Sequence, residues 1–252
     1  LPTPKLETGK PITIAVEPSP AQKEFVSALS ELSSKIASGY FSDKSYNNLC
    51  VTNDWRLGAL DMRCVDTEKF VKLGYDIDTD DYEHSKINAC VSEVYKTYKE
   101  TESEKLTQLI FCDLSTPKGG ERFSVYDDIK AKLIDKGINE NEIAFIHDAK
   151  NDTEKEQLFK KLRSGDIRIL IGSTSKMGAG TNVQNKLIET HRIDCPYRPR
   201  DLEQADGRIL RRGNENESVR IKRYVTKNTF DSYLWQIIEN KQRFISQIMT
   251  GE

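Results

Sequence analysis

The 252-residue sequence contains few cysteines and histidines, and none of them has the spacing of a metal site. Its five cysteines form no Cys-x-x-Cys pair, and its three histidines lie far apart along the chain. This pattern argues against a zinc site. Scattered cysteines that act as small apolar fillers are typical of a reducing compartment. We therefore expect a cytoplasmic protein that binds no metal through this chain.

Long apolar runs and an excess of one charge are also missing. No apolar stretch approaches the roughly 18 residues of a membrane helix, and no signal-peptide pattern is present. Charged residues make up 31% of the chain and hydrophobic residues 37%, which is typical of a globular protein that contacts no membrane. Because the formal net charge is −2, any contact with nucleic acid must come from a local basic patch. The chain begins with Leu1 rather than Met, and we expect it to be a piece of a longer protein.

Short apolar runs alternate with helical patterns in the second part of the chain. Strand candidates lie at 108–112, 142–147, 167–172, 191–194 and 219–225. Strands that alternate with helices of about ten residues imply right-handed crossovers and a mainly parallel sheet. The sequence therefore predicts an α/β fold. The last helix, from about Phe230, has one broad apolar stripe that we expect to be buried.

The first part of the chain has a different pattern. A short strand at 12–16 precedes a helix whose start is marked by Ser19, Pro20 and Gln22, a capping-box sequence. Residues 40–83 are poorly periodic and end in an acidic stretch. We therefore place a boundary near residue 83, with a helical segment at 1–83 and the α/β domain at 84–252.

Three polar loops follow predicted strands, where open α/β sheets bind ligands. They are "DLSTPKGG" (113–120), "STSKMGAGTN" (173–182) and "CPYRPRDLEQADGRILRRG" (195–213). "STSKMGAGTN" (173–182) contains glycines that allow a bulky anion to approach the backbone, although a simple strand-to-helix turn would have the same composition. In "QADGRILRRG" (204–213), a helix would place Gln204, Arg208 and Arg211 on one face, with Arg212 off it. Arginine is suited to bidentate phosphate contacts. Together the loops predict a phosphate site.

These loops resemble motifs V and VI of superfamily 2 helicases, and most closely those of Swi/Snf-type DNA translocases. The resemblance runs in order through "STSKMGAGTN", "DCPYRP" (194–199) and "QADGRILRRGN" (204–214), and "LIFCDLST" (109–116) resembles motif IV. "CPYR" departs from the family's Pro-Trp-Trp-Asn, and Asn214 stands where the family often has Gln. A looser resemblance links the chain to the helicase-methylase proteins of phages and mobile elements.

The resemblance implies a RecA-like (P-loop NTPase-type) C-terminal lobe and a role for each matching residue in an ATP site. Arg211 would be the catalytic arginine finger that reaches the γ-phosphate bound on a partner lobe. Arg208 would be a second catalytic phosphate contact. Gln204 would couple the nucleotide to motif VI. The nucleotide side of the cleft would be shaped by Gly178, Gly180 and Asn182.

The same resemblance implies double-stranded DNA as a partner. The DNA backbone would be faced by Thr174, Lys176, Ser115 and Thr116. Such contacts position the protein without reading the base sequence. The other partner would be the protein's own N-terminal ATPase lobe.

The sequence contains neither a P-loop, G-x-x-x-x-G-K-[ST], nor an acidic Mg²⁺ motif, both of which a complete motor needs. We therefore expect ATP and Mg²⁺ to act only in the full-length ATP-dependent helicase or translocase. The chain alone is expected to bind ATP weakly and to hydrolyse essentially none.

Two other functions fit parts of the sequence. "DCPY" (194–197) matches three of the four positions of the Asp/Asn-Pro-Pro-Tyr motif with which amino-methyltransferases hold a flipped base, but no glycine-rich cofactor strand accompanies it. Alternatively, the chain could be a non-catalytic module that docks nucleic acid through Arg208 and Arg211. Such a module predicts affinity that falls steeply with salt.

Overall fold

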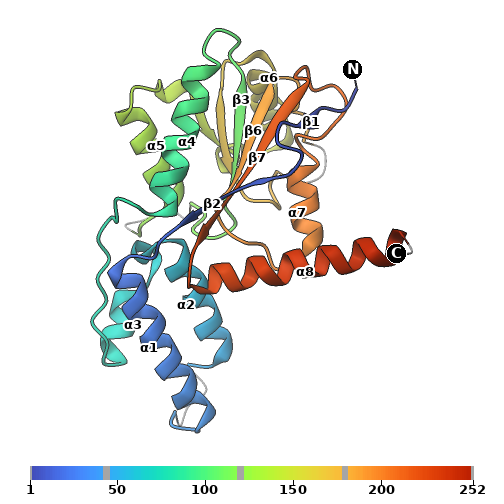
Figure 1. The fold of residues 1–252 in the computed structure, drawn as a ribbon. Coiled ribbons are helices and arrows are strands. Elements are labelled where there is room, and N and C mark those ends of the chain that lie inside the picture. Colours follow the sequence, from blue (N-terminus) through green and yellow to red (C-terminus); the bar gives the residue numbers. More distant parts are fainter. Residues whose placement is uncertain (1, 42–45, 118–121, 178–180, 251–252) are drawn as a thin grey trace.

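The computed structural model describes residues 2–41, 46–117, 122–177 and 181–250, which build one sheet with helices on both faces and a helical layer at one end (Figure 1). The strands are β1 (Lys5–Leu6), β2 (Ile12–Val16), β3 (Thr107–Phe111), β4 (Ile143–Phe145), β5 (Ile169–Gly172), β6 (Leu187–Arg192) and β7 (Ser218–Thr226). The α-helices are α1 (Pro20–Ala37), α2 (Asn48–Leu60), α3 (Thr67–Lys72), α4 (Lys86–Glu100), α5 (Val125–Asp135), α6 (Asp152–Ser164), α7 (Pro199–Asp206) and α8 (Phe230–Thr250). Short 3₁₀ turns are η1 (Met62–Cys64), η2 (Glu140–Glu142) and η3 (Ile146–Asp148).

The sheet has the order β1-β7-β6-β3-β5-β4, with β2 also paired to β7, and its pairs are parallel. This arrangement confirms the predicted α/β fold and contains all five strand candidates of the second part of the chain. The first part also contributes to the sheet, because β1 and β2 pair with successive stretches of β7. The division at residue 83 stays a prediction, but β1 and β2 within the first segment are strands of the common sheet rather than helices.

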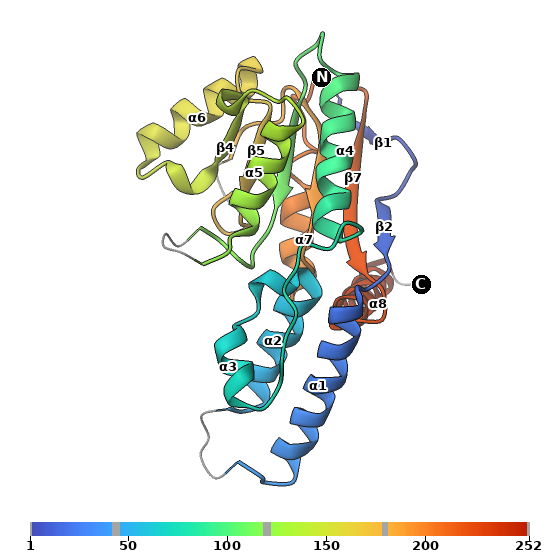
Figure 2. The ribbon, with the colours of Figure 1, turned by 90° about the vertical axis from the view of Figure 1, so that its left-hand side faces the viewer.

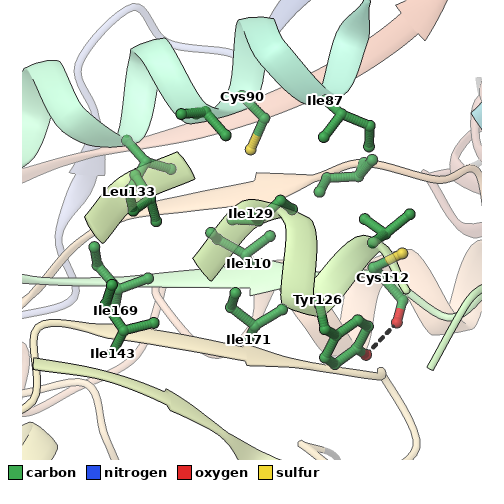
Figure 3. Close-up of a cluster of buried hydrophobic side chains, with 14 of the residues drawn as sticks. Ile87, Cys90, Ile110, Cys112, Tyr126, Ile129, Leu133, Ile143, Ile169 and Ile171 are labelled. Atoms are coloured by element: carbon green, nitrogen blue, oxygen red, sulfur yellow. Dashed lines mark hydrogen bonds between the residues drawn. The ribbon is translucent and has the colours of Figure 1, made fainter. Parts of the chain in front are cut away.

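Alternation along the central strand divides the core into two layers. Ile110 of β3 and Cys112, the residue after the strand, face α4 and α5. Leu109 and Phe111 of β3 face α6 and α7 on the other side. Figure 3 shows the first layer, in which the Tyr126 hydroxyl donates to the Cys112 carbonyl at 2.5 Å. Each buried Leu, Ile or Phe side chain contributes about 1.5–3 kcal/mol relative to exposure. Because β3 is covered on both faces, its residues Leu109–Phe111 and the following Cys112 form a continuous apolar run.

Helices α1, α2 and α3 form a separate layer below the sheet (Figure 2). The predicted capping box of α1 is confirmed: the Gln22 amide donates to Ser19 Oγ at 3.0 Å, and the Ser19 amide donates to Gln22 Oε1 at 2.9 Å. At Gly58 of α2, an added Cβ would lie 2.4 Å from the Phe25 ring of α1. Glycine at this position therefore allows the two helices to pack closely.

Helix α2 and helix α3 were not evident in the poorly periodic stretch 40–83. Helix α2 contacts α1 on one side and α8 on another. Its buried residues, which include Val51, Asp54 and Leu60, therefore do not form a single stripe. A helix that is buried on more than one face lacks the 3.6-residue pattern by which amphipathic helices are recognised.

Helix α8 differs from its prediction in its second half. Leu234 and Ile238 are buried as expected, but Tyr233 is 56% exposed, Phe244 is 63% exposed and Ile248 is 64% exposed. The helix runs past α7 and away from the sheet (Figure 1). The prediction of one buried stripe along the whole helix was therefore wrong, because the described residues place no element against its far end.

A charged network lies between α4 and the sheet, centred on the fully buried Glu189 of β6. Glu189 accepts a hydrogen bond from Thr97 Oγ1 at 2.9 Å and pairs with Arg220 Nε at 2.5 Å and Lys222 Nζ at 3.0 Å. Burial opposes its ionisation, but contacts with His191 and the two cations outweigh burial and lower the pKa of Glu189 to about 2. The carboxylate is therefore ionised in the folded state.

Replacing Glu189 with Gln is expected to lower the free energy of unfolding at neutral pH by about 3 kcal/mol. The folded-state pKa lies below the ordinary value of 4.5, so the ionised group stabilises the fold above that pH, and the contribution is lost as the pH falls toward about 2. Denaturant unfolding at several pH values should show a flatter acid dependence for Glu189→Gln. The matched control is Glu93→Gln, since Glu93 pairs with the same Lys222 but is 31% exposed; its cost should stay below about 1 kcal/mol. Equal costs for the two variants would contradict the prediction.

Candidate functional site

A polar cleft of about 470 Å³ lies at the carboxyl ends of the parallel strands. Asp113 and Thr116 follow β3, His147 follows β4, residues 173–176 follow β5, and Asp201 and Gln204 lie on α7. Strand ends of this kind are where open α/β sheets bind ligands. The fold therefore brings four predicted site residues into one cleft, namely Thr116, Thr174, Lys176 and Gln204.

Three residues from different strand ends form the floor of this cleft: Asp113 and Thr174 line it, and Arg192 is buried behind them. Asp113 accepts hydrogen bonds from the Thr174 amide at 2.6 Å and from the Thr174 hydroxyl at 3.1 Å. Arg192 Nη2 contacts the same carboxylate at 2.6 Å, and its Nη1 donates to the Thr174 hydroxyl. Thr174 is buried, and its donors are used within the protein. Its predicted contact with the DNA backbone stays a prediction, and in the structure the side chain holds the loop after β5 in place.

Burial and charge act in opposite directions on the two carboxylates beside Arg192. Burial opposes the ionisation of Asp113, but the Arg192 charge and the Thr174 hydrogen bonds outweigh it and lower the pKa of Asp113. Asp194 is more deeply enclosed, and burial raises its pKa despite the attraction of Arg192. The floor therefore contains one firmly ionised pair, Asp113 with Arg192.

Asp194, the acid of "DCPY", is turned into the protein. It is 2% exposed, and its Oδ2 accepts hydrogen bonds from the Asp113 and Leu114 amides at 2.7 Å each. Tyr197 of the same motif is 47% exposed and lies under the Arg56 guanidinium at 4.1 Å from the ring centroid. A methyltransferase needs this acid to face a flipped base. The geometry therefore disfavours the methyltransferase alternative.

The two arginines of the predicted phosphate site do not lie on a helical face. Helix α7 ends at Asp206, and Arg208 and Arg211 lie in the turns that follow. Buried Ile209 and Asn214 hold these turns against the sheet. Asn214 Nδ2 donates a hydrogen bond of 2.8 Å to the carbonyl of Leu187, the first residue of β6. The predicted i, i+4, i+7 helical face was therefore wrong, because the helix stops where the chain turns to pack Ile209.

The turns nevertheless bring the two guanidinium groups together. Arg208 Nη1 and Arg211 Nη1 both donate to the Thr181 carbonyl, at 3.3 and 3.1 Å. Within the part of the chain that the structure describes, neither arginine pairs with a carboxylate. Burial and the charge of Arg211 lower the pKa of Arg208. Two neighbouring, uncompensated guanidinium groups are suited to binding an anion.

The other described residues that were predicted for the site are not among those that line the cleft. Gly178 and Gly180 lie outside the described residues. Asn182 is exposed, and its carbonyl accepts a hydrogen bond from Arg163 Nη1 at 2.7 Å. Ser115 Oγ accepts a hydrogen bond from the Val125 amide at 3.1 Å at the start of α5, and Ser115 is absent from the residues that line the cleft. Arg212 is exposed, as expected for a solvated charge.

Sequence reasoning missed Asp113, Arg192 and His147 as residues of this site. Asp113 directly follows a buried strand, which was a signal for a strand-end carboxylate. Arg192 gave no such signal, because it is the last residue of β6 and is 97% enclosed, where a charge is not expected. His147 follows the short strand β4, which brings it into the cleft only through the pairing of β4 with β5.

The described ranges contain neither a metal-binding cluster nor a membrane-spanning helix. Among those residues no group of three or more His, Cys, Asp or Glu side chains is arranged to hold a metal ion. No helix of the same ranges is long and apolar enough to cross a membrane. The binding of Mg²⁺ by the full-length protein stays a prediction.

Comparisons with known proteins identify the family. The helicase conserved C-terminal domain matches residues 86–213, just over half of the chain. The fold is shared with the C-terminal part of the Fun30 ATPase domain, with a TM-score of 0.69 at 17% identity over 94% of this chain and 90% of that one.

Two curated relatives match over 97 residues, or 38% of this chain. Defense against restriction protein B of Escherichia phage P1 is 28% identical, and an uncharacterized ATP-dependent helicase, YqhH of Bacillus subtilis (strain 168), is 33% identical. The match spans only 4% and 16% of these proteins. Because the family model matches more than half of the chain and the fold agrees with it, the chain belongs to the helicase conserved C-terminal domain family.

Proposed function

We propose that this chain is the C-terminal motor lobe of an ATP-dependent DNA helicase or translocase of the Swi/Snf type. In this proposal the lobe completes an ATP site that it shares with an N-terminal lobe. The fold shared with the Fun30 ATPase domain and the relative named as an ATP-dependent helicase support this assignment. The motor activity belongs to the full-length protein, and this chain contributes motifs V and VI to it.

The observation that carries the proposal is the pair of uncompensated guanidinium groups on the Thr181 carbonyl. Arg211 is exposed and Arg208 is half-buried, so Arg211 is the residue that reaches the γ-phosphate on the partner lobe. Arg208 then supplies a second phosphate contact, and exposed Gln204 couples the nucleotide to the turn after α7. Asn182, with Gly178 and Gly180, shapes the nucleotide side of the site. The two arginines fit the charge that ATP presents, and when bound with Mg²⁺ this cofactor supplies the phosphoryl group that is transferred to water.

The cleft at the strand ends is the proposed path of the DNA backbone. Exposed Lys176 and half-buried Thr116 line it, and Thr174 and Ser115 hold the two loops from which they project. Double-stranded DNA is the proposed substrate. Lysine and hydroxyl contacts to phosphate position a protein on DNA without reading its sequence.

The proposal is tested by ATP hydrolysis with and without the N-terminal lobe. The 252-residue chain with Mg²⁺, ATP and duplex DNA is expected to show no turnover above buffer, because it supplies only one side of the site. The same chain joined to its N-terminal lobe is expected to hydrolyse ATP, and duplex DNA should stimulate the rate. Mg²⁺-dependent turnover by the isolated chain that Arg211→Ala abolishes would refute the division of the site. A joined protein that hydrolyses no ATP under any condition would refute the motor assignment.

A further inference from the structure

His147 occupies one wall of the cleft, although no motif of the sequence pointed to it. It lies in η3, directly after β4, and faces the loop that follows β5. Gly172 at the end of β5 makes this approach possible, since an added Cβ there would lie 2.6 Å from Ile146 Cγ2 of η3. The glycine therefore brings His147 beside Lys176.

One side of the His147 ring is enclosed and the other is available to a ligand. The ring meets the edge of Tyr126 at a centroid distance of 5.3 Å, and Tyr126 is itself buried and anchored on the Cys112 carbonyl. His147 Nδ1 is buried and has no hydrogen-bond partner among the described residues. Nε2 is not enclosed in this way and also makes no hydrogen bond within that part of the chain. Nε2 is therefore the ring nitrogen that can donate to a group in the cleft.

The charges around His147 come from each element packed against it. Lys176 from the loop after β5 faces it, Asp148 lies on its own turn, and Asp201 of α7 lines the opposite wall. Asp113 after β3 is compensated, because its oxygens accept hydrogen bonds from Thr174 and Arg192. Tyr126 of α5 presents only its ring.

These surroundings disfavour protonation of the imidazole in the unliganded cleft. Burial and the positive charge of Lys176 lower the pKa of His147, and Asp148 offsets this only in part. An anion placed between Lys176 and His147 would act in the opposite direction, because a nearby negative charge favours the protonated ring. The cleft therefore has one permanent cation and one that an anionic ligand can create.

We propose that His147 contacts a backbone phosphate of the bound nucleic acid through Nε2 and takes up a proton as the nucleic acid binds. The inference rests on the proposed function, in which the cleft holds the DNA backbone. Phosphodiester is the matching ligand, because it offers acceptor oxygens and a single negative charge to a site with Thr116, Lys176 and His147 on its walls. Sequence-independent contacts of this kind strengthen with each cation that reaches a phosphate.

The test is the affinity of the chain for a labelled duplex oligonucleotide, measured by fluorescence anisotropy between about pH 8 and about pH 6. Wild-type affinity is expected to rise severalfold as the pH falls; if binding raises the pKa of His147 by about one unit, the limit of this rise is about tenfold, and it is approached only below the pKa of the free protein. The slope of log K against log salt should also steepen by about 0.9 at the lower pH, one additional phosphate contact. His147→Asn and His147→Gln are both expected to lose most of the pH dependence and the added slope, with thermal melting confirming that each variant is folded.

The other two histidines provide the control. His84 is exposed, so His84→Asn should keep the full pH dependence, whereas His191 is wholly buried between Tyr224 and Gln108. A pH dependence that survives in both folded His147 variants overturns the proposal.

Two further outcomes distinguish a failure of the His147 proposal from a failure of the proposed function. Absence of duplex binding at every pH refutes the DNA contact of the proposed function itself. If Mg²⁺–ATP displaces the duplex from the cleft with the same His147-dependent pH effect, the ligand of His147 is a nucleotide and the nucleic-acid assignment is overturned.

Discussion

Replacing Arg211 with Ala in the full-length protein is expected to reduce ATP turnover by about 10³-fold or more, while DNA affinity stays nearly unchanged. Arg211 is exposed at the end of the turns after α7 and has no carboxylate partner within the described part of the chain. Its guanidinium can therefore stabilise the charge that develops on the γ-phosphate. Steady-state ATPase assays at saturating DNA measure the loss. Arg211→Lys should recover little activity, because an ammonium group lacks the planar fork that makes bidentate phosphate contacts.

Arg212→Ala is the matched control for this prediction. Arg212 is the adjacent arginine and is also exposed, but it makes none of the contacts with Thr181 that hold Arg208 and Arg211. Its replacement should leave turnover within about twofold, as expected for a surface charge. If Arg211→Ala instead weakens DNA binding with a steep salt dependence and leaves turnover intact, the chain acts as a nucleic-acid-binding module, the alternative that the sequence left open.

Replacing Asp231 with Ala is expected to destabilise the lobe by about 3–5 kcal/mol, the largest effect on stability that the structure predicts. Asp231, in the first turn of α8, accepts hydrogen bonds from Lys86 Nζ at 2.8 Å and from the Thr226 amide at 2.9 Å. The exposed fractions of Lys86 and Asp231 are only 1% and 5%. Burial raises the pKa of Asp231, and Lys86 opposes this shift. Without the carboxylate, the Lys86 ammonium is buried with no counter-charge. Urea unfolding at neutral pH measures the cost.

Two comparisons make this prediction specific to burial. Lys227→Ala removes the exposed pair with Glu17 at the same end of β7, and it should cost less than about 1 kcal/mol. The double variant Lys86→Met with Asp231→Leu should recover much of the lost stability, because it leaves no buried charge unpaired. A double variant as unstable as Asp231→Ala would show that packing, rather than the unpaired charge, causes the loss.

The parallel sheet could be predicted because its strands contain short apolar runs that are separated by helices of ordinary length. Each apolar run, such as 108–112, has to be covered on both sides, and crossover helices are the connections that do so. Helix α2 could not be predicted from the sequence, because it is buried on several sides and shows no single apolar stripe. The far half of α8 carries the stripe of a buried helix, but Phe244 and Ile248 are exposed.

For the candidate site, the sequence predicted the identity of several residues but not their arrangement. Motif order along the chain was enough to select Lys176, Gln204, Arg208 and Arg211, since each belongs to a stretch that matches a motif of the family. Their arrangement was not predictable, because the turn after Asp206 depends on where Ile209 packs against the sheet. That turn, and not a helical face, brings both arginines onto the Thr181 carbonyl.

The sequence by itself determined the fold class, the family and the candidate residues that belong to the motifs, because these depend on local pattern and on motif order. Only the tertiary structure decided which of those residues are available to a ligand. Thr174 and Ser115 are used to hold loops, Asp113 pairs with Arg192 at the floor of the cleft, and His147 lies beside Lys176 in its wall. Apart from the contact of Ser115 with Val125 of α5, these relations join residues that follow or end different strands. Strand order in the sheet sets such distances, and no local stretch of the chain encodes them.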